Sequence, residues 1–198
     1  PAALAITTTV TLAVELLFSR LISVLFMAWD AYWVVAIALL GFGMGGALVA
    51  VATARLERAA DDLLPLLMIA IGVSAVLPPL LLRPLDPDVG EALGADGLSA
   101  IYWIVSLLCM VPFLLASVYI ALVFTRGRHH IGRLYFFDLL GSGLGCVAFL
   151  AILELLGAEV GLAVAGMLAV LASALIVPRW GPRHAAAFAA GLVVLVAA

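Results

Sequence analysis

Two ionisable residues, Glu15 and Arg20, stand in the middle of a mostly apolar stretch near the start of the chain. If this stretch crosses a membrane, an ionised side chain is costly there unless it faces other protein segments or a water-filled cavity. A separation of five residues turns a straight helix through about 140°, so the two are poor partners for each other. Each therefore requires a partner on a second helix.

Two further carboxyl groups, those of Asp138 and Glu154, occur in a later apolar stretch. From a rise of about 1.5 Å per residue, we predict that Arg20 meets Glu154 in the outer half of the membrane, while Asp138 lies just inside the cytoplasmic boundary. These contacts would link the first and fifth apolar segments. Two interpretations stay open, namely a path for protons or substrate, and neutralised pairs that only fix helix packing.

Glycines recur at two places, in GFGMGG with Gly41 and Gly45 and in GSGLG with Gly141 and Gly145. The GxxxG spacing lets helix backbones approach closely in lipid, so we predict that these four glycines are helix-packing positions. GSGLG also resembles part of a dinucleotide-binding fingerprint. That motif follows a strand, whereas this one is embedded in an apolar run, so nucleotide binding is not expected.

Other residue types that bind metals or act in catalysis are not grouped in the sequence. Cys109 and Cys146 fall in separate apolar stretches, and the pair His129 and His130 has no clustered Cys, His or carboxylate beside it. We therefore predict no metal, no cofactor and no catalytic residues in this chain. Whether it belongs to an enzyme stays open.

The composition indicates which elements must position these residues. Of the 198 residues, 67% are hydrophobic and 11% are charged, and the mean hydropathy is +1.34. A soluble domain is typically about half apolar and about a quarter charged, and a soluble fold of this size has too little interior for so many apolar side chains. The sequence thus predicts an all-α, polytopic bundle of transmembrane helices surrounded by lipid. A net charge of −3 without a clustered basic face argues against nucleic-acid binding.

Apolar segments of about 20 residues, the length that crosses a bilayer, divide the chain into six spans and the start of a seventh. The glycine runs fall in the second and fifth spans, a placement compatible with a 3+3 inverted repeat of the transporter kind. The connection over 83–97 is rich in Pro, Gly and Asp and is expected to be a solvated loop. All spans form a single transmembrane domain over 1–198, and we place them at 5–28, 31–54, 63–82, 98–125, 134–156, 159–177 and 185–198.

Arginines gather in alternate loops, and this asymmetry predicts the orientation. Basic residues in short loops mark the cytoplasmic side of a membrane protein. The alternate loops on the opposite side carry Arg83 together with acidic residues, so the N-terminus is predicted to be cytoplasmic. Seven arginines follow the second, fourth and sixth spans: Arg55, Arg58, Arg126, Arg128, Arg133, Arg179 and Arg183.

Two stretches resemble the membrane part of bacterial multi-pass proteins often described as fused MFS/spermidine synthases. They are VELLFSRLISVLF through AYWVVAIALLGFGMGG over 14–46, and GRLYFFDLLGSGLGCVAFLAILELLGA over 132–158. Glu15 and Arg20 match the family's ionisable pair in the first span, and Asp138 matches its entry to the fifth. The resemblance implies a membrane domain in the bacterial inner membrane, joined to a soluble C-terminal domain of the polyamine aminopropyltransferase type, which would hold any catalytic residues.

Three functions follow as expectations. The first is the integral membrane domain of a spermidine-synthase-like protein, which anchors the enzyme or moves a small amine-like solute. The second is a structural or accessory subunit, packed against other membrane subunits, and the third is a complete secondary transporter. Because the sequence starts without Met and stops at Ala198 within an apolar run, we expect a fragment of a longer chain.

Overall fold

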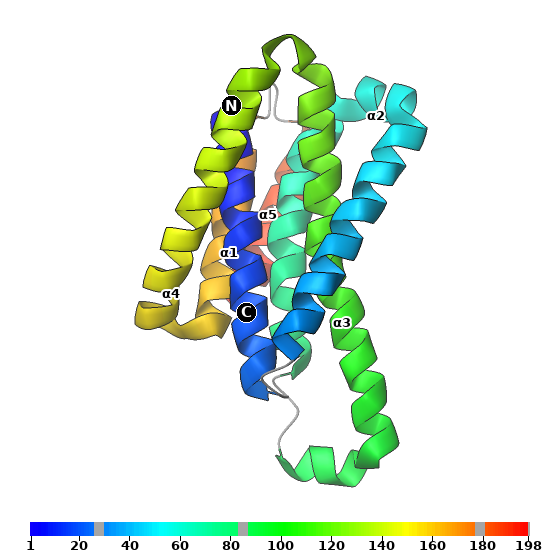
Figure 1. The fold of residues 1–198 in the computed structure, drawn as a ribbon, viewed down its shortest axis with the longest axis vertical. Helices are drawn as coiled ribbons and strands as arrows, with labels where there is room; N and C mark the ends of the chain where they lie inside the picture. Colours follow the sequence, from blue (N-terminus) through cyan, green and yellow to red (C-terminus); the bar gives the residue numbers. More distant parts are fainter. Residues whose placement is uncertain (26–29, 83–86, 177–180, 198) are drawn as a thin grey trace.

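The computed structural model describes residues 1–25, 30–82, 87–176 and 181–197, and nearly all of them are helical (Figure 1). Within these ranges there is no strand, so the predicted all-α class is confirmed. In chain order the elements are α1 (Ala2–Leu25), α2 (Asp30–Leu82), α3 (Pro87–Arg126), the short 3-10 helix η1 (Arg128–His130), α4 (Ile131–Ser173) and α5 (Pro182–Ala197).

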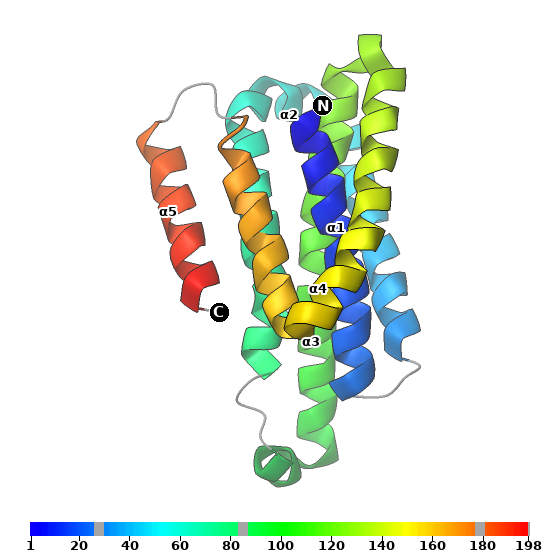
Figure 2. The same cartoon turned by 90° about the vertical axis from the view of Figure 1, so that its left-hand side faces the viewer.

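Two of the long helices change direction within their length. α2 departs from helical geometry at Ala52 (φ −107°, ψ 16°), and α4 does so at Gly157 (φ 78°, ψ 176°). Figures 1 and 2 show the chain folding back in both helices, so that each forms two legs. Gly157 has a positive φ, a backbone conformation that residues with a side chain rarely adopt. Glycine therefore suits this turn.

The predicted connections differ from the observed ones at two places. Residues 55–62, expected between two spans, are helical within α2, because their Ala, Leu, Arg and Glu residues favour a helix despite their charge. The prediction of a loop over 83–97 is wrong from Pro87 onward, because α3 begins at that residue. Residues 83–86 lie outside the described ranges. Proline suits the first position of a helix, where its missing N–H group costs nothing.

Four of the described helices are long and apolar enough to cross a membrane, judged by length and composition. The division into six spans and the 3+3 repeat stay predictions. The four candidate spans are Ala2–Val24, Tyr32–Leu81, Ile101–Arg126 and Arg128–Ser173, and Pro182–Ala197 is a shorter apolar helix.

The bundle is apolar on the outside as well as in its core. Inside, Phe18 of α1 meets Phe113 of α3 edge to face, with ring centroids 6.1 Å apart. Outside, the first leg of α4 exposes Leu144, Val147 and Leu150. Large exposed apolar surfaces are unfavourable in water and favourable in hydrocarbon, so this arrangement is compatible with a membrane protein.

Three arginine-bearing segments meet at the end of the bundle where the N-terminus lies (Figures 1 and 2). Arg126 at the end of α3 forms an ion pair of 2.6 Å with Asp61 of α2, and a ring nitrogen of His184 in α5 lies 3.2 Å from the backbone oxygen of Asp62. The hydrogen bond and the charge of Arg126 lower the pKa of Asp61, which lies in the polar segment between the two apolar legs of α2. The described arginines of these three segments therefore lie at one polar end of the bundle.

Candidate functional site

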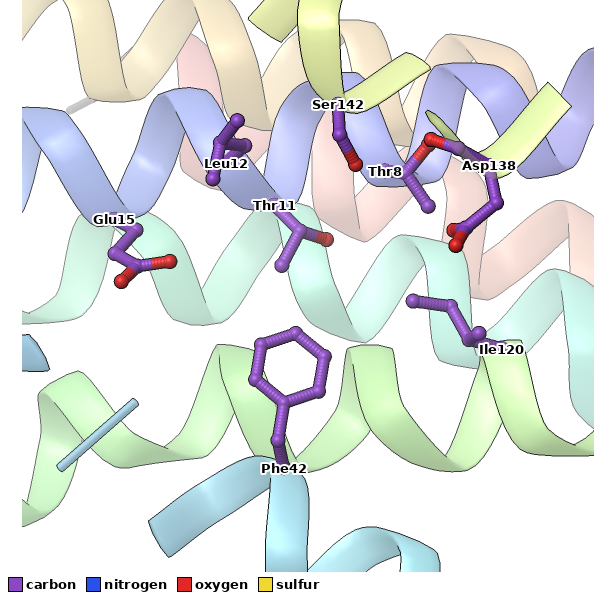
Figure 3. A pocket seen from close by; sticks show the side chains of 8 residues that line it. All are labelled: Thr8, Thr11, Leu12, Glu15, Phe42, Ile120, Asp138 and Ser142. Carbon is purple, nitrogen blue, oxygen red and sulfur yellow. The ribbon is translucent and has the colours of Figure 1, made fainter. Parts of the chain in front are cut away.

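A cavity of about 260 Å³ lies between α1, the first leg of α2, α3 and the first leg of α4 (Figure 3). It brings together two residues that the sequence analysis singled out, Glu15 of α1 and Asp138 of α4. The other lining residues are Thr8, Thr11 and Leu12 of α1, Phe42 of α2, Ile120 of α3 and Ser142 of α4.

Glycines hold α4 against α1 on one side of this cavity. A side chain at Gly141 would collide with the hydroxyl group of Thr8, and a Cβ atom at Gly145 would come within 2.7 Å of the backbone oxygen of Thr9. Hydroxyl groups of α1 use this close approach to reach α4. Thr9 Oγ1 donates to the backbone oxygen of Gly141 at 2.8 Å, and Thr8 Oγ1 donates to that of Asp138 at 3.2 Å. These contacts place Asp138 beside the cavity.

The second pair of glycines forms a similar contact between α2 and α3. A Cβ atom at Gly41 would meet α3 backbone atoms at about 3.0 Å, and one at Gly45 would lie 2.6 Å from the backbone oxygen of Leu114. Ser117 Oγ donates to the backbone oxygen of Phe42 at 2.7 Å. This contact fixes the part of α2 that carries the aromatic ring into the cavity.

The two carboxyl groups lie toward opposite ends of the cavity, with Thr11 and Phe42 between them (Figure 3). Glu15 and Asp138 are both partly buried, and among the described residues neither side chain has a hydrogen-bond or ion-pair partner. The described lining contains no Arg, Lys or His. In its ionised form, a carboxylate removed from bulk water is stabilised by a cation or bound water beside it, so the ionised pair favours positive charge in the cavity.

The predicted contact between Arg20 and Glu154 is not formed. Both residues are exposed, and within the described parts of the chain no ion pair joins them. Arg20 lies about 140° around α1 from Glu15, which faces the cavity, and so it turns outward. α1 and α4 do pack together, but threonine hydroxyls, glycine backbone and apolar side chains, rather than charges, make the contact.

Several lining residues were not singled out in the sequence. Thr8, Thr11 and Glu15 are spaced by three and four residues, a pattern that places them on one face of a helix. Ser142 follows Asp138 by four residues on α4 in the same way. These spacings could have extended the predicted site from the two carboxyl groups.

The described side chains include no group of three or more His, Cys, Asp or Glu that could hold a metal ion. No protein-family model, no curated protein and no solved structure matches this chain. The cavity and the charges around it are therefore the basis for assigning a function.

Proposed function

We propose that this chain is an integral membrane domain that binds a small organic cation between Glu15 and Asp138 and moves it within the membrane. The observation that carries the proposal is one cavity inside an apolar helix bundle. Its two carboxyl groups have no partner among the described residues, and its described lining has no basic side chain. Such a cavity supplies negative charge that compensates the charge of a cationic ligand. The surrounding lipid and apolar side chains supply none.

Electrostatics in this setting discriminates strongly between ligands. Two unit charges about 4 Å apart interact by about 1 kcal/mol in water, but by about 4 kcal/mol at an effective dielectric constant of about 20. A cation between Glu15 and Asp138 gains from both carboxylates, whereas an anion of the same shape is repelled by both. The expected order of affinity is therefore cation, then neutral analogue, then anion.

The size and the apolar part of the lining restrict the ligand further. Small-molecule sites usually enclose about 300–1,000 Å³. A cavity of about 260 Å³ falls just below that range, so the ligand has only a few carbon atoms. Leu12, Phe42 and Ile120 provide contacts for a short hydrocarbon segment. A small alkylamine has this combination of charge and hydrocarbon.

The resemblance to fused MFS/spermidine synthases supports an amine as the solute. Both stretches that carry the resemblance contribute to the cavity, 14–46 through Glu15 and Phe42, and 132–158 through Asp138 and Ser142. In this proposal the membrane domain anchors a soluble aminopropyltransferase-like domain and exchanges a polyamine-related amine with it.

The arginine-rich end is assigned to the cytoplasm of a bacterial inner membrane in the same proposal. Arginines accumulate on the cytoplasmic side of membrane proteins, where they also lie beside anionic lipid headgroups. The N-terminus lies at this end, and so do the bend of α2 and the connection between α3 and α4 (Figure 1).

Three ligands of matched length test the proposal. We expect the purified chain in detergent to bind n-butylammonium saturably in equilibrium dialysis, 1-butanol more weakly and butyrate not measurably. The longer cation 1,4-diaminobutane tests whether a second amino group adds affinity. Absence of saturable cation binding, or butyrate binding as tight as that of butylammonium, would contradict the proposal.

A further inference from the structure

The hydroxyl groups of Thr8 and Thr11, the two threonines in the cavity, already donate hydrogen bonds to backbone oxygens. Thr11 Oγ1 donates to the backbone oxygen of Thr7 at 2.7 Å. Thr8 Oγ1 lies 3.1 Å from the backbone oxygen of Ala5 and 3.2 Å from that of Asp138. A hydroxyl group has one O–H donor and two acceptor lone pairs. Both threonines therefore present only acceptors to a ligand.

The rest of the polar lining adds mostly acceptors. When ionised, the carboxylates of Glu15 and Asp138 accept hydrogen bonds and donate none. Ser142 has no hydrogen bond to the described residues, so its hydroxyl group can turn either way. No other described lining residue carries a side-chain N–H or O–H group. The cavity thus combines negative charge with a large excess of hydrogen-bond acceptors.

We infer that the cavity selects cations that carry N–H groups, namely protonated primary amines, over fully methylated ammonium ions of equal charge. This inference rests on the proposed function, since it assumes that the cavity binds a cation. A primary ammonium group has three N–H donors and can reach a carboxylate and the hydroxyl oxygen of Thr11 together. A trimethylammonium group has no donor, and its methyl groups hold the charge away from those oxygens.

Two other kinds of cation fit the lining less well. Quaternary ammonium ions are recognised by cages of several aromatic rings, and Phe42 is the one aromatic residue in the described lining. An alkali metal ion suits oxygen ligands, but it cannot fill about 260 Å³ or use the apolar contacts of Leu12 and Ile120. An alkylammonium ion satisfies both the oxygens and the apolar side chains.

A matched pair of ligands tests the inference on the purified full chain. Unlabelled n-butylammonium and n-butyltrimethylammonium compete separately with radiolabelled n-butylammonium at constant ionic strength. Sites built to hydrogen-bond a ligand discriminate strongly against analogues without the donor, and we expect butylammonium to bind at least about tenfold more tightly. Equal affinities, or tighter binding of the trimethyl compound, would overturn the inference and leave cation binding intact. Absence of saturable binding of both cations would overturn the proposed function itself.

Two threonine variants test where the preference arises. Thr11→Val keeps the approximate shape and removes the acceptor, so it should weaken butylammonium binding several-fold, leave butyltrimethylammonium binding unchanged and reduce the preference. Thr125→Val is the matched control, because Thr125 Oγ1 donates to the backbone oxygen of Ala121 at the same 2.7 Å but does not line the cavity. An unchanged preference in Thr11→Val, or an equal loss in both variants, would overturn the assignment to the cavity.

Discussion

Thr9 on α1 donates a hydrogen bond of 2.8 Å from its hydroxyl group to the backbone oxygen of Gly141 on α4. The bond is short enough to form because Gly141 and Gly145 place no side chain between the two helices. One turn before Gly141, Asp138 lines the cavity together with residues of α1. The position of a candidate ligand-binding carboxyl group therefore depends on a contact between glycine backbone and threonine.

Gly141→Ala should destabilise the protein by about 1–3 kcal/mol, because the added Cβ atom would collide with Thr8 Oγ1 and the backbone oxygen of Ala5. Thermal unfolding in detergent measures the effect. Gly143→Ala is the control, since a Cβ atom there meets nothing within 4 Å. It should leave stability unchanged or raise it slightly, because alanine favours a helix more than glycine does. Equal effects of the two substitutions would contradict the observed packing.

Ser19 provides a prediction of the opposite sign. Its Oγ atom is buried and has no hydrogen-bond partner among the described residues. An unsatisfied buried hydroxyl group costs about 1–3 kcal/mol, so Ser19→Ala should preserve or increase thermal stability. Ser117→Ala should reduce it, because Ser117 Oγ donates to the backbone oxygen of Phe42. If both variants lost the same stability, Ser19 would have to contribute a stabilising contact of its own.

Together with the proposed cytoplasmic assignment of this end, the shared end of the arginine-bearing segments predicts a labelling pattern. Arg55→Cys in α2 and Arg128→Cys in η1, each made in a Cys146→Ser background, should react with a membrane-impermeant maleimide in inverted vesicles. In intact spheroplasts both should be protected, and after lysis both should react. Labelling of the two positions from opposite faces would exclude the arrangement in which these segments share one end.

The helical class could be predicted from the sequence because composition and segment length constrain it strongly. Long apolar segments must satisfy their backbone groups internally in lipid, and a helix does so locally. The GxxxG spacing likewise identified Gly41 and Gly45 as candidates for close helix contacts, and the structure places both against α3. Both features depend on residues near one another in sequence.

The partners of individual side chains were harder to predict, because they depend on the rotation of each helix about its axis. Depth along the axis suggested that Arg20 and Glu154 meet, but both point away from the protein interior. The cavity depends on four helices placed together, and no local pattern in one helix specifies that placement. The three- and four-residue spacing of Thr8, Thr11 and Glu15 indicated only which residues share a face.

The most direct test of cation binding compares three carboxyl substitutions by the equilibrium affinity for n-butylammonium. Glu15→Gln and Asp138→Asn remove one charge each from the cavity, while Glu154→Gln removes one from an exposed position on α4. We predict that each cavity substitution weakens binding at least about tenfold, equivalent to about 1.4 kcal/mol, and that Glu154→Gln binds like the unsubstituted protein. Equal affinities for all three variants, with each still folded, would contradict a cation site between Glu15 and Asp138.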